Sequence, residues 1–176
     1  HIRSFFNKSY SVLQQKSILA QGEMLSTALL QYALEEKNIT SRLLPALDFM
    51  RIDKDEEPDE FYIRENLHRK LSEHPNIKLF ITQGYICRNA FGEVDNLKRG
   101  GSDYTASLIG SALDAKEVQI WTDVDGFHNN DPRYVEKTSV IRSLSFDEAA
   151  ELAYFGAKVL HPASVLPCKL KEIPVR

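Results

Sequence analysis

The stretch IKLFITQG at residues 77–84 determines how the rest of the chain is interpreted. Residues 77–82 are apolar on both faces and rich in β-formers, which predicts a buried strand that ends at Gln83 and Gly84. EVQIWT at 117–122 predicts a second buried strand, and residues 102–113 between the two predict a helix. Short strands that alternate with helices favour an α/β domain with a mostly parallel sheet.

The remaining elements follow the same alternation. Helices are expected at 14–36 and 62–73, from Ser145 to a break at Gly156, and after Pro162. Ser145 and Glu148 have the spacing of a capping box. Further strands are expected at 41–48, weakened by Pro45, and from residue 173 onward. Residues 88–97 predict a loop or hairpin, and the acidic run at 53–60 predicts a solvated loop.

Composition excludes several classes of protein. The 176 residues have a net charge of -3, with 43% hydrophobic and 27% charged residues, as in a globular protein that does not bind nucleic acid. Two distant cysteines form no disulfide framework and no metal-binding spacing. No membrane span or signal peptide is visible, so a cytoplasmic location is expected. Because the chain starts at His1 and stops within an expected strand, both ends are expected to be cut.

The run RGGSDYTA at 99–106 carries the clearest local signal for ligand binding. Gly100 and Gly101 let the backbone pass close to a ligand and lead into a helix start, where free N–H groups attract anions. Ser102 is the expected N-cap, and Arg99 offers a planar donor fork for a carboxylate or phosphate. Taken alone, the glycine pair favours a tight turn before a capped helix, and the run has neither P-loop nor dinucleotide-fingerprint spacing.

A second stretch, WTDVDG at 121–126, follows the strand at 117–122. Thr122 and Asp123 therefore fall at the carboxyl end of an expected parallel strand, the edge where open α/β sheets bind ligands. Arg133, further along, offers charge to phosphates. An Asp-rich surface turn explains this segment equally well when it is taken alone.

Two more stretches contain isolated charged residues. Lys158 interrupts the apolar run FGAKVLHP at 155–162, so it either extends to solvent or points at a ligand anion. His161, before a proline, is expected to be structural. Glu23 in AQGE at 20–23 lies near the expected start of a helix and could contact an amine, although by itself it also fits a solvated glutamate.

Together and in this order, these four stretches resemble the aspartate kinase branch of the amino-acid kinase family. The resemblance spans residues 21–176 and is looser over 41–75. It implies a three-layer α/β/α sandwich like carbamate kinase, ATP with Mg²⁺, and L-aspartate as phosphoryl acceptor. The implied product is 4-phospho-L-aspartate, made in the first step of lysine, threonine and methionine biosynthesis. A carboxylate is already ionised at neutral pH, so the transfer needs positioning and charge neutralisation rather than a general base.

The resemblance also implies roles for individual residues. Glu23 matches the family's contact to the substrate amino group, Arg99 the contact to a substrate carboxylate, and Ser102 the aspartate-binding loop. Asp103 matches the acidic residue that organises the catalytic lysine. The matches to nucleotide contacts are Thr122, Asp123, His128, Arg133, Lys158 and Val159. His128 stands where many relatives carry a tyrosine, and an imidazole can still stack there.

Two features of the family are not found in this sequence. The opening strand and loop of the form Lys-Phe/Tyr-Gly-Gly, which binds the transferring phosphate, is not found, nor are the regulatory ACT domains that follow the catalytic domain in the family. Residues 1–176 are therefore expected to be a partial catalytic domain, incomplete at the N-terminus, of a longer homo-oligomeric enzyme. Two alternatives stay open: a fragment that binds nucleotide or aspartate without chemistry, and another amino-acid kinase acting on glutamate, acetylglutamate or uridylate.

Overall fold

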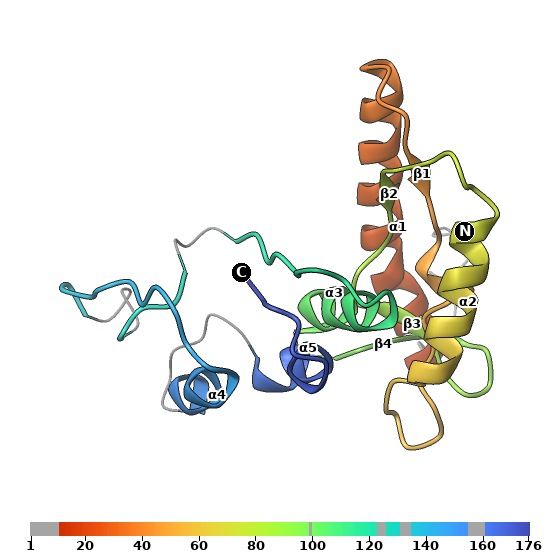
Figure 1. Cartoon of the computed structure of the whole chain (residues 1–176). Helices are drawn as coiled ribbons and strands as arrows, with labels where there is room; N and C mark the ends of the chain where they lie inside the picture. Colours follow the sequence, from red (N-terminus) through yellow and green to blue (C-terminus); the bar gives the residue numbers. More distant parts are fainter. Residues whose placement is uncertain (1–10, 99, 123–125, 131–134, 155–160) are drawn as a thin grey trace. The chain divides into compact units, whose positions relative to one another are not determined.

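The computed structural model describes residues 11–98, 100–122, 126–130, 135–154 and 161–176. The protein divides into two compact units, His1–Ser102 and Asp103–Arg176. Helix α3 (Gly101–Ala112) begins at the end of the first unit and continues into the second. The first unit combines helices with two short strand pairs (Figure 1), and the second combines helices with isolated β-bridges.

Helix α1 (Val12–Glu36) begins the described part of the first unit. Its start is fixed by a capping box, in which Gln14 N donates to Ser11 Oγ at 3.2 Å and Ser11 N donates to Gln14 Oε1 at 3.0 Å. The prediction that Glu23 lies near a helix start is wrong, because this cap places Glu23 in the middle of α1. The helix dipole, which acts within the first turn, therefore contributes little at Glu23.

A parallel strand pair stands beside α1 (Figure 1). Strand β1 (Arg42–Leu43) pairs in parallel with β2 (Phe80–Ile81), and helix α2 (Glu60–Ser72) connects them, so parallel pairing is confirmed here. The strand expected at 41–48 is shorter than predicted. Pro45 has no N–H to donate, and it leads into the 3₁₀ helix η2 (Ala46–Asp48) instead.

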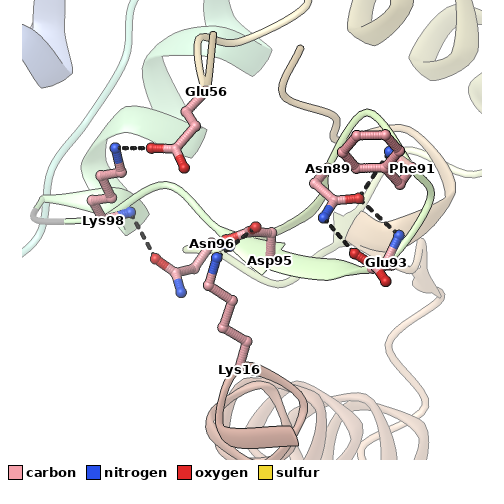
Figure 2. Close-up of polar contacts among 8 residues, drawn as sticks. All are labelled: Lys16, Glu56, Asn89, Phe91, Glu93, Asp95, Asn96 and Lys98. Carbon is pink, nitrogen blue, oxygen red and sulfur yellow. Dashed lines mark hydrogen bonds and ion pairs between the residues drawn. The ribbon is translucent and has the colours of Figure 1, made fainter. Parts of the chain in front are cut away.

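An antiparallel hairpin follows β2, which settles the loop-or-hairpin prediction for 88–97. Strand β3 (Ile86–Arg88) pairs with β4 (Val94–Asn96), and Cys87 lies opposite Asp95. The Asn89 side chain organises the connecting turn: its Oδ1 accepts from Phe91 N at 2.9 Å and Glu93 N at 3.0 Å (Figure 2). The buried apolar residues of the first unit include Leu44, Ala46, Phe49, Met50, Ile52, Ile63, Leu67, Ile81, Ile86 and Cys87.

The second unit packs helices around a small core of Val118, Cys168 and Ile173. Helices α4 (Phe146–Tyr154), η3 (Pro162–Val165) and α5 (Leu166–Leu170) confirm the expected helices after Ser145 and Pro162. The capping box is present, since Glu148 N donates to Ser145 Oγ at 3.2 Å and Ser145 N donates to Glu148 Oε2 at 2.7 Å. Cys87 and Cys168 are buried free thiols, as expected.

The strands predicted at 117–122 and from 173 onward pair with each other in parallel. Val118 N donates to Pro174 O at 2.9 Å, and Ile120 N donates to Arg176 O at 2.7 Å. Between these two segments, the described residues form one β-bridge, Val118 with Val175. Adjacency of the segments 77–82 and 117–122 in one sheet stays a prediction. None of the described helices is both long and apolar enough to cross a bilayer.

Candidate functional site

The half-buried Glu23 lies on α1, between two attachments of that helix to the rest of the first unit. On its N-terminal side, Lys16 forms an ion pair with Asp95 of β4 at 2.7 Å. On its C-terminal side, Thr27 Oγ1 donates to the Glu23 carbonyl at 2.8 Å and accepts from Gln83 Nε2 at 2.8 Å. The backbone that carries Glu23 is therefore held on both sides.

Gln83 connects three segments of the first unit. Its side chain is buried, with 3% of the residue exposed. Its Nε2 reaches Thr27 on α1, while its Oε1 accepts a hydrogen bond from Ala46 N, the first residue of η2, at 2.8 Å. A buried amide whose donor and acceptor are both used fixes the relative position of the segments that it joins. Gln83 thereby orients α1 against the turn that follows β2.

That turn also contacts the loop that leads into α3. Leu97 N donates to Tyr85 O at 2.8 Å. A Cβ added to Gly84 would lie 2.9 Å from both Cβ and Oγ of Ser102, closer than side-chain carbons approach one another, so only glycine leaves room for the serine. Gly84 of this turn therefore packs closely against Ser102.

Ser102 is not the N-cap that its sequence predicts. Helix α3 begins at Gly101, which puts Ser102 inside its first turn with an exposed side chain. Gly100 precedes the helix at φ +70°, a left-handed conformation that suits glycine, and it turns the chain into the helix one residue earlier than expected. Backbone N–H groups at a helix start attract anions in general.

Asp103 occupies the first turn of α3 and is half-buried. Burial raises the pKa of the Asp103 carboxyl above its ordinary value of 3.8. Within the described residues no cation pairs with this carboxylate. A carboxylate in this state gains from a positive partner, which fits the role of organising a lysine that the resemblance implies.

Thr122 borders a cavity in the second unit. The cavity has a volume of about 890 Å³ and a mostly apolar lining that includes Trp121, Phe127 and Phe146. The Trp121 side chain is 89% exposed and offers a flat aromatic face. An apolar cavity with a few polar groups at its edge is the usual form of a small-molecule site.

His128 is placed by the strand-like pairing of its own segment. It forms an antiparallel bridge with Val140, and its Nδ1 lies 2.8 Å from Thr138 Oγ1. His128 is not among the residues that line the cavity, although its neighbour Phe127 is. Thr122 and His128 thus belong to the same unit, but only Thr122 of the two lines the cavity.

Five of the expected site residues lie outside the described residues: Arg99, Asp123, Arg133, Lys158 and Val159. No group of three or more His, Cys, Asp or Glu side chains among the described residues converges as a metal site. A magnesium ion carried by nucleotide phosphates needs few protein ligands, so this donor set is compatible with Mg²⁺ that arrives with ATP.

Comparison with known proteins identifies the family. Residues 5–176 match the profile of the Amino acid kinase family. The chain belongs to this family. Lysine-sensitive aspartokinase 3 of Escherichia coli (strain K12) is 42% identical over 161 residues, which are 90% of this chain and 36% of that protein. The chain therefore spans little more than a third of the length of this relative.

Solved structures confirm the predicted amino-acid kinase fold. E. coli aspartokinase III in complex with aspartate and ADP matches with a TM-score of 0.88 and 40% identity, over 95% of this chain and 38% of that chain. Clostridium acetobutylicum aspartate kinase matches with a TM-score of 0.71 and 30% identity, over 88% of this chain and 33% of that chain. The resemblance to aspartate kinases is thereby confirmed.

The attachments of α1 were missed by the sequence analysis. The sequence predicts for Gln83 only a place in a turn, and it predicts no contact for Lys16 or Asp95. No local sequence pattern marks these contacts, because the partners are distant in the chain. Gln83 and Thr27 are 56 positions apart, and Lys16 and Asp95 are 79 positions apart. Of these residues, only Gln83 has a sequence signal, because a polar residue directly after the buried segment 77–82 is expected to need hydrogen-bond partners.

Proposed function

We propose that the protein containing this chain is an aspartate kinase, which transfers the γ-phosphoryl group of ATP to the side-chain carboxylate of L-aspartate. The observation that carries the proposal is the match, at 40% identity over 95% of this chain, to an aspartokinase whose structure holds aspartate and ADP. The product is 4-phospho-L-aspartate, an acyl phosphate. Residues 1–176 are proposed to be part of the catalytic domain, with regulatory ACT domains elsewhere in a homo-oligomeric, cytoplasmic protein.

The first unit is proposed to hold the acceptor. Glu23 binds the substrate ammonium group, Arg99 binds a substrate carboxylate, and Ser102 contributes from the first turn of α3. The Gln83 attachment of α1 and the Gly84 contact with Ser102 support these roles because they keep the backbones of Glu23 and Ser102 in place. Asp103 orients the cation that faces the transferring phosphoryl group. An ionised acceptor needs this positioning more than it needs a base.

The second unit is proposed to hold the nucleotide. Thr122 at the edge of an apolar cavity, and the aromatic face of Trp121 beside it, support this assignment. The remaining proposed contacts are Asp123, His128, Arg133, Lys158 and Val159. Mg²⁺ neutralises the phosphate charges and is expected to reach the site on the nucleotide, so no residue of this chain is proposed as its ligand.

Formation of acyl phosphate by the full-length protein tests the proposal. The protein is incubated with MgATP and aspartate, and the product is trapped as a hydroxamate. We expect turnover with aspartate and none with glutamate, acetylglutamate or uridylate. Turnover with one of those acceptors instead would identify another amino-acid kinase. Aspartate or nucleotide binding without turnover would identify a binding module.

Replacement of Glu23 tests the acceptor site. Glu23→Gln removes a charge-assisted contact, typically worth about 1.5–3 kcal/mol, so KM for aspartate should rise roughly ten- to a hundredfold. KM for ATP should stay within about twofold, because the contact is to the amino acid alone. Glu35→Gln on the exposed end of the same helix is the matched control. Equal increases in both KM values would contradict the assignment of Glu23.

A further inference from the structure

The ion pair between Lys16 and Asp95 joins α1 to the hairpin strand β4 (Figure 2). Lys16 Nζ lies 2.7 Å from Asp95 Oδ2, and the side chains are 26% and 10% exposed. Asp95 Oδ1 accepts a second hydrogen bond, from Asn96 N at 2.8 Å. A hydrogen-bonded ion pair with so little exposure differs from an ordinary surface pair, because removal of one partner leaves the other charge poorly solvated.

Lys16 is the cation that binds Asp95 directly, and the charge of Asp95 also acts on Lys98. Cys87 lies directly across the hairpin from Asp95 and is fully buried. Burial, and secondarily the Asp95 charge, raise the pKa of the Cys87 thiol to about 12. The thiol is therefore neutral at physiological pH and adds no second negative charge beside Lys16.

The ion pair also lies close in sequence to both proposed substrate contacts. Lys16 precedes Glu23 by about two turns of α1, so both side chains lie on the same face of the helix. Asp95 lies in β4, which leads within a few residues to Arg99 and then Ser102. The pair thus connects the helix that carries Glu23 to the strand that precedes α3 in the chain.

Side-chain contacts continue along the connecting segment. Lys98 N donates to Asn96 Oδ1 at 3.0 Å, and Lys98 Nζ donates to Glu56 Oε2 at 2.5 Å (Figure 2). Lys98 adopts φ +61°, a left-handed conformation that is unfavourable for a lysine and has to be maintained by its surroundings. The chain is therefore restrained from Asp95 up to the residue before Arg99.

From these contacts we propose that Lys16 and Asp95 are positioning residues for the amino-acid acceptor. They touch no substrate. Their ion pair fixes α1 against β4, so that Glu23 on α1 and Ser102 in the first turn of α3 bind one aspartate molecule at the same time. This inference rests on the proposed function, and it assigns the pair to aspartate binding rather than to nucleotide binding.

Kinetics of the full-length protein test the inference. We compare wild type with Lys16→Met, Asp95→Asn and the apolar pair Lys16→Met with Asp95→Leu. Asp48→Asn is the matched control, because Asp48 pairs at 3.3 Å with Lys70, a lysine side chain that is also 26% exposed, elsewhere in the first unit. KM for each substrate and kcat are measured by hydroxamate trapping, aspartate affinity by calorimetry, and folding by thermal melts.

Each single variant should raise KM and Kd for aspartate about tenfold, within the range of interaction energies for residues in direct contact. KM for ATP and kcat should change by less than about twofold. The apolar pair should recover most of the aspartate affinity, because matched apolar side chains often replace a buried ion pair without loss of stability. Should Asp95→Asn fail to fold, Asp95→Glu takes its place, since it keeps the charge and moves the carboxylate by one methylene.

Three results would overturn the inference while leaving the proposed function intact. They are folded single variants with unchanged aspartate affinity, equal increases in KM for aspartate and ATP, and an apolar pair as weak as the single variants. The first of these is the result expected of a purely structural role, which would lower the melting temperature without changing aspartate affinity. Wild-type protein that neither binds nor phosphorylates aspartate would overturn the proposed function and the inference together.

Discussion

Replacing Gln83 with leucine should loosen the first unit at the point where α1, η2 and the turn after β2 meet. The substitution keeps the volume close to that of glutamine and removes two hydrogen bonds, one to Thr27 Oγ1 and one from Ala46 N. Thr27 Oγ1 still donates to the Glu23 carbonyl. Ala46 is fully buried, so its N–H loses its acceptor without access to water. Most of the cost therefore falls on that single N–H group.

The magnitude follows from these contacts. A buried donor left unsatisfied costs about 1–3 kcal/mol, and the lost bond to Thr27 adds about 1 kcal/mol. Gln83→Leu should therefore lower the free energy of local opening by about 2–4 kcal/mol. This corresponds to roughly 30- to 700-fold faster hydrogen exchange wherever exchange follows the opening equilibrium.

Hydrogen exchange of the full-length protein measures this effect directly. Exchange at the Ala46 amide and along β2 should accelerate, and KM for aspartate should rise, because the Glu23 backbone loses one of its two supports. Gln119→Leu makes the same chemical change on an exposed side chain and should alter stability by less than about 0.5 kcal/mol. Unchanged exchange at Ala46 in the Gln83→Leu protein would refute the assignment of Gln83 as a structural connector.

Two further predictions concern Ser102 and its neighbour Asp103. Gly84→Ala places a methyl group 2.9 Å from Ser102 Cβ and 3.0 Å from its Cα, so Ser102 has to move. Aspartate affinity, measured by calorimetry, should fall while ATP affinity is retained. Unchanged aspartate affinity would argue against Ser102 as an acceptor contact. Because burial raises the pKa of Asp103, the folded protein retains a proton that the unfolded chain has released, and stability should decline as the pH rises above 3.8 and through the folded-state pKa. Asp103→Asn should remove this part of the pH dependence of the melting temperature, and an identical pH profile in the two proteins would contradict it.

Local signals predicted the helices well, because their determinants lie within a few residues of each other. The Ser145–Glu148 capping box lies three positions apart in the chain and sets the start of α4. The sequence predicts the start of α1 at residue 14, two residues late, although Ser11 and Gln14 have the spacing of a capping box. Residue type predicts Ser102 as an N-cap, whereas α3 begins at Gly101, directly after Gly100 in its left-handed conformation.

The strands were less predictable, since a strand exists only where a partner lies beside it. The segment 117–122 has the composition of a buried strand, yet among the described residues its pairing with the end of the chain amounts to a single bridge at Val118. Pro45 shortens the strand expected at 41–48, and the extent of that shortening depends on where β2 stops pairing.

What the sequence determined by itself is the resemblance to aspartate kinases, because the motifs at 99–106, 121–126 and 155–162 appear in the order typical of that branch of the family. The tertiary structure alone decided how α1 is attached to the rest of the first unit. Lys16 meets Asp95 across 79 positions of chain, and Gln83 meets Thr27 across 56. Such pairs have no sequence pattern, because the energy of a buried ion pair or amide depends on which distant group the fold brings to it and on how much water the fold excludes.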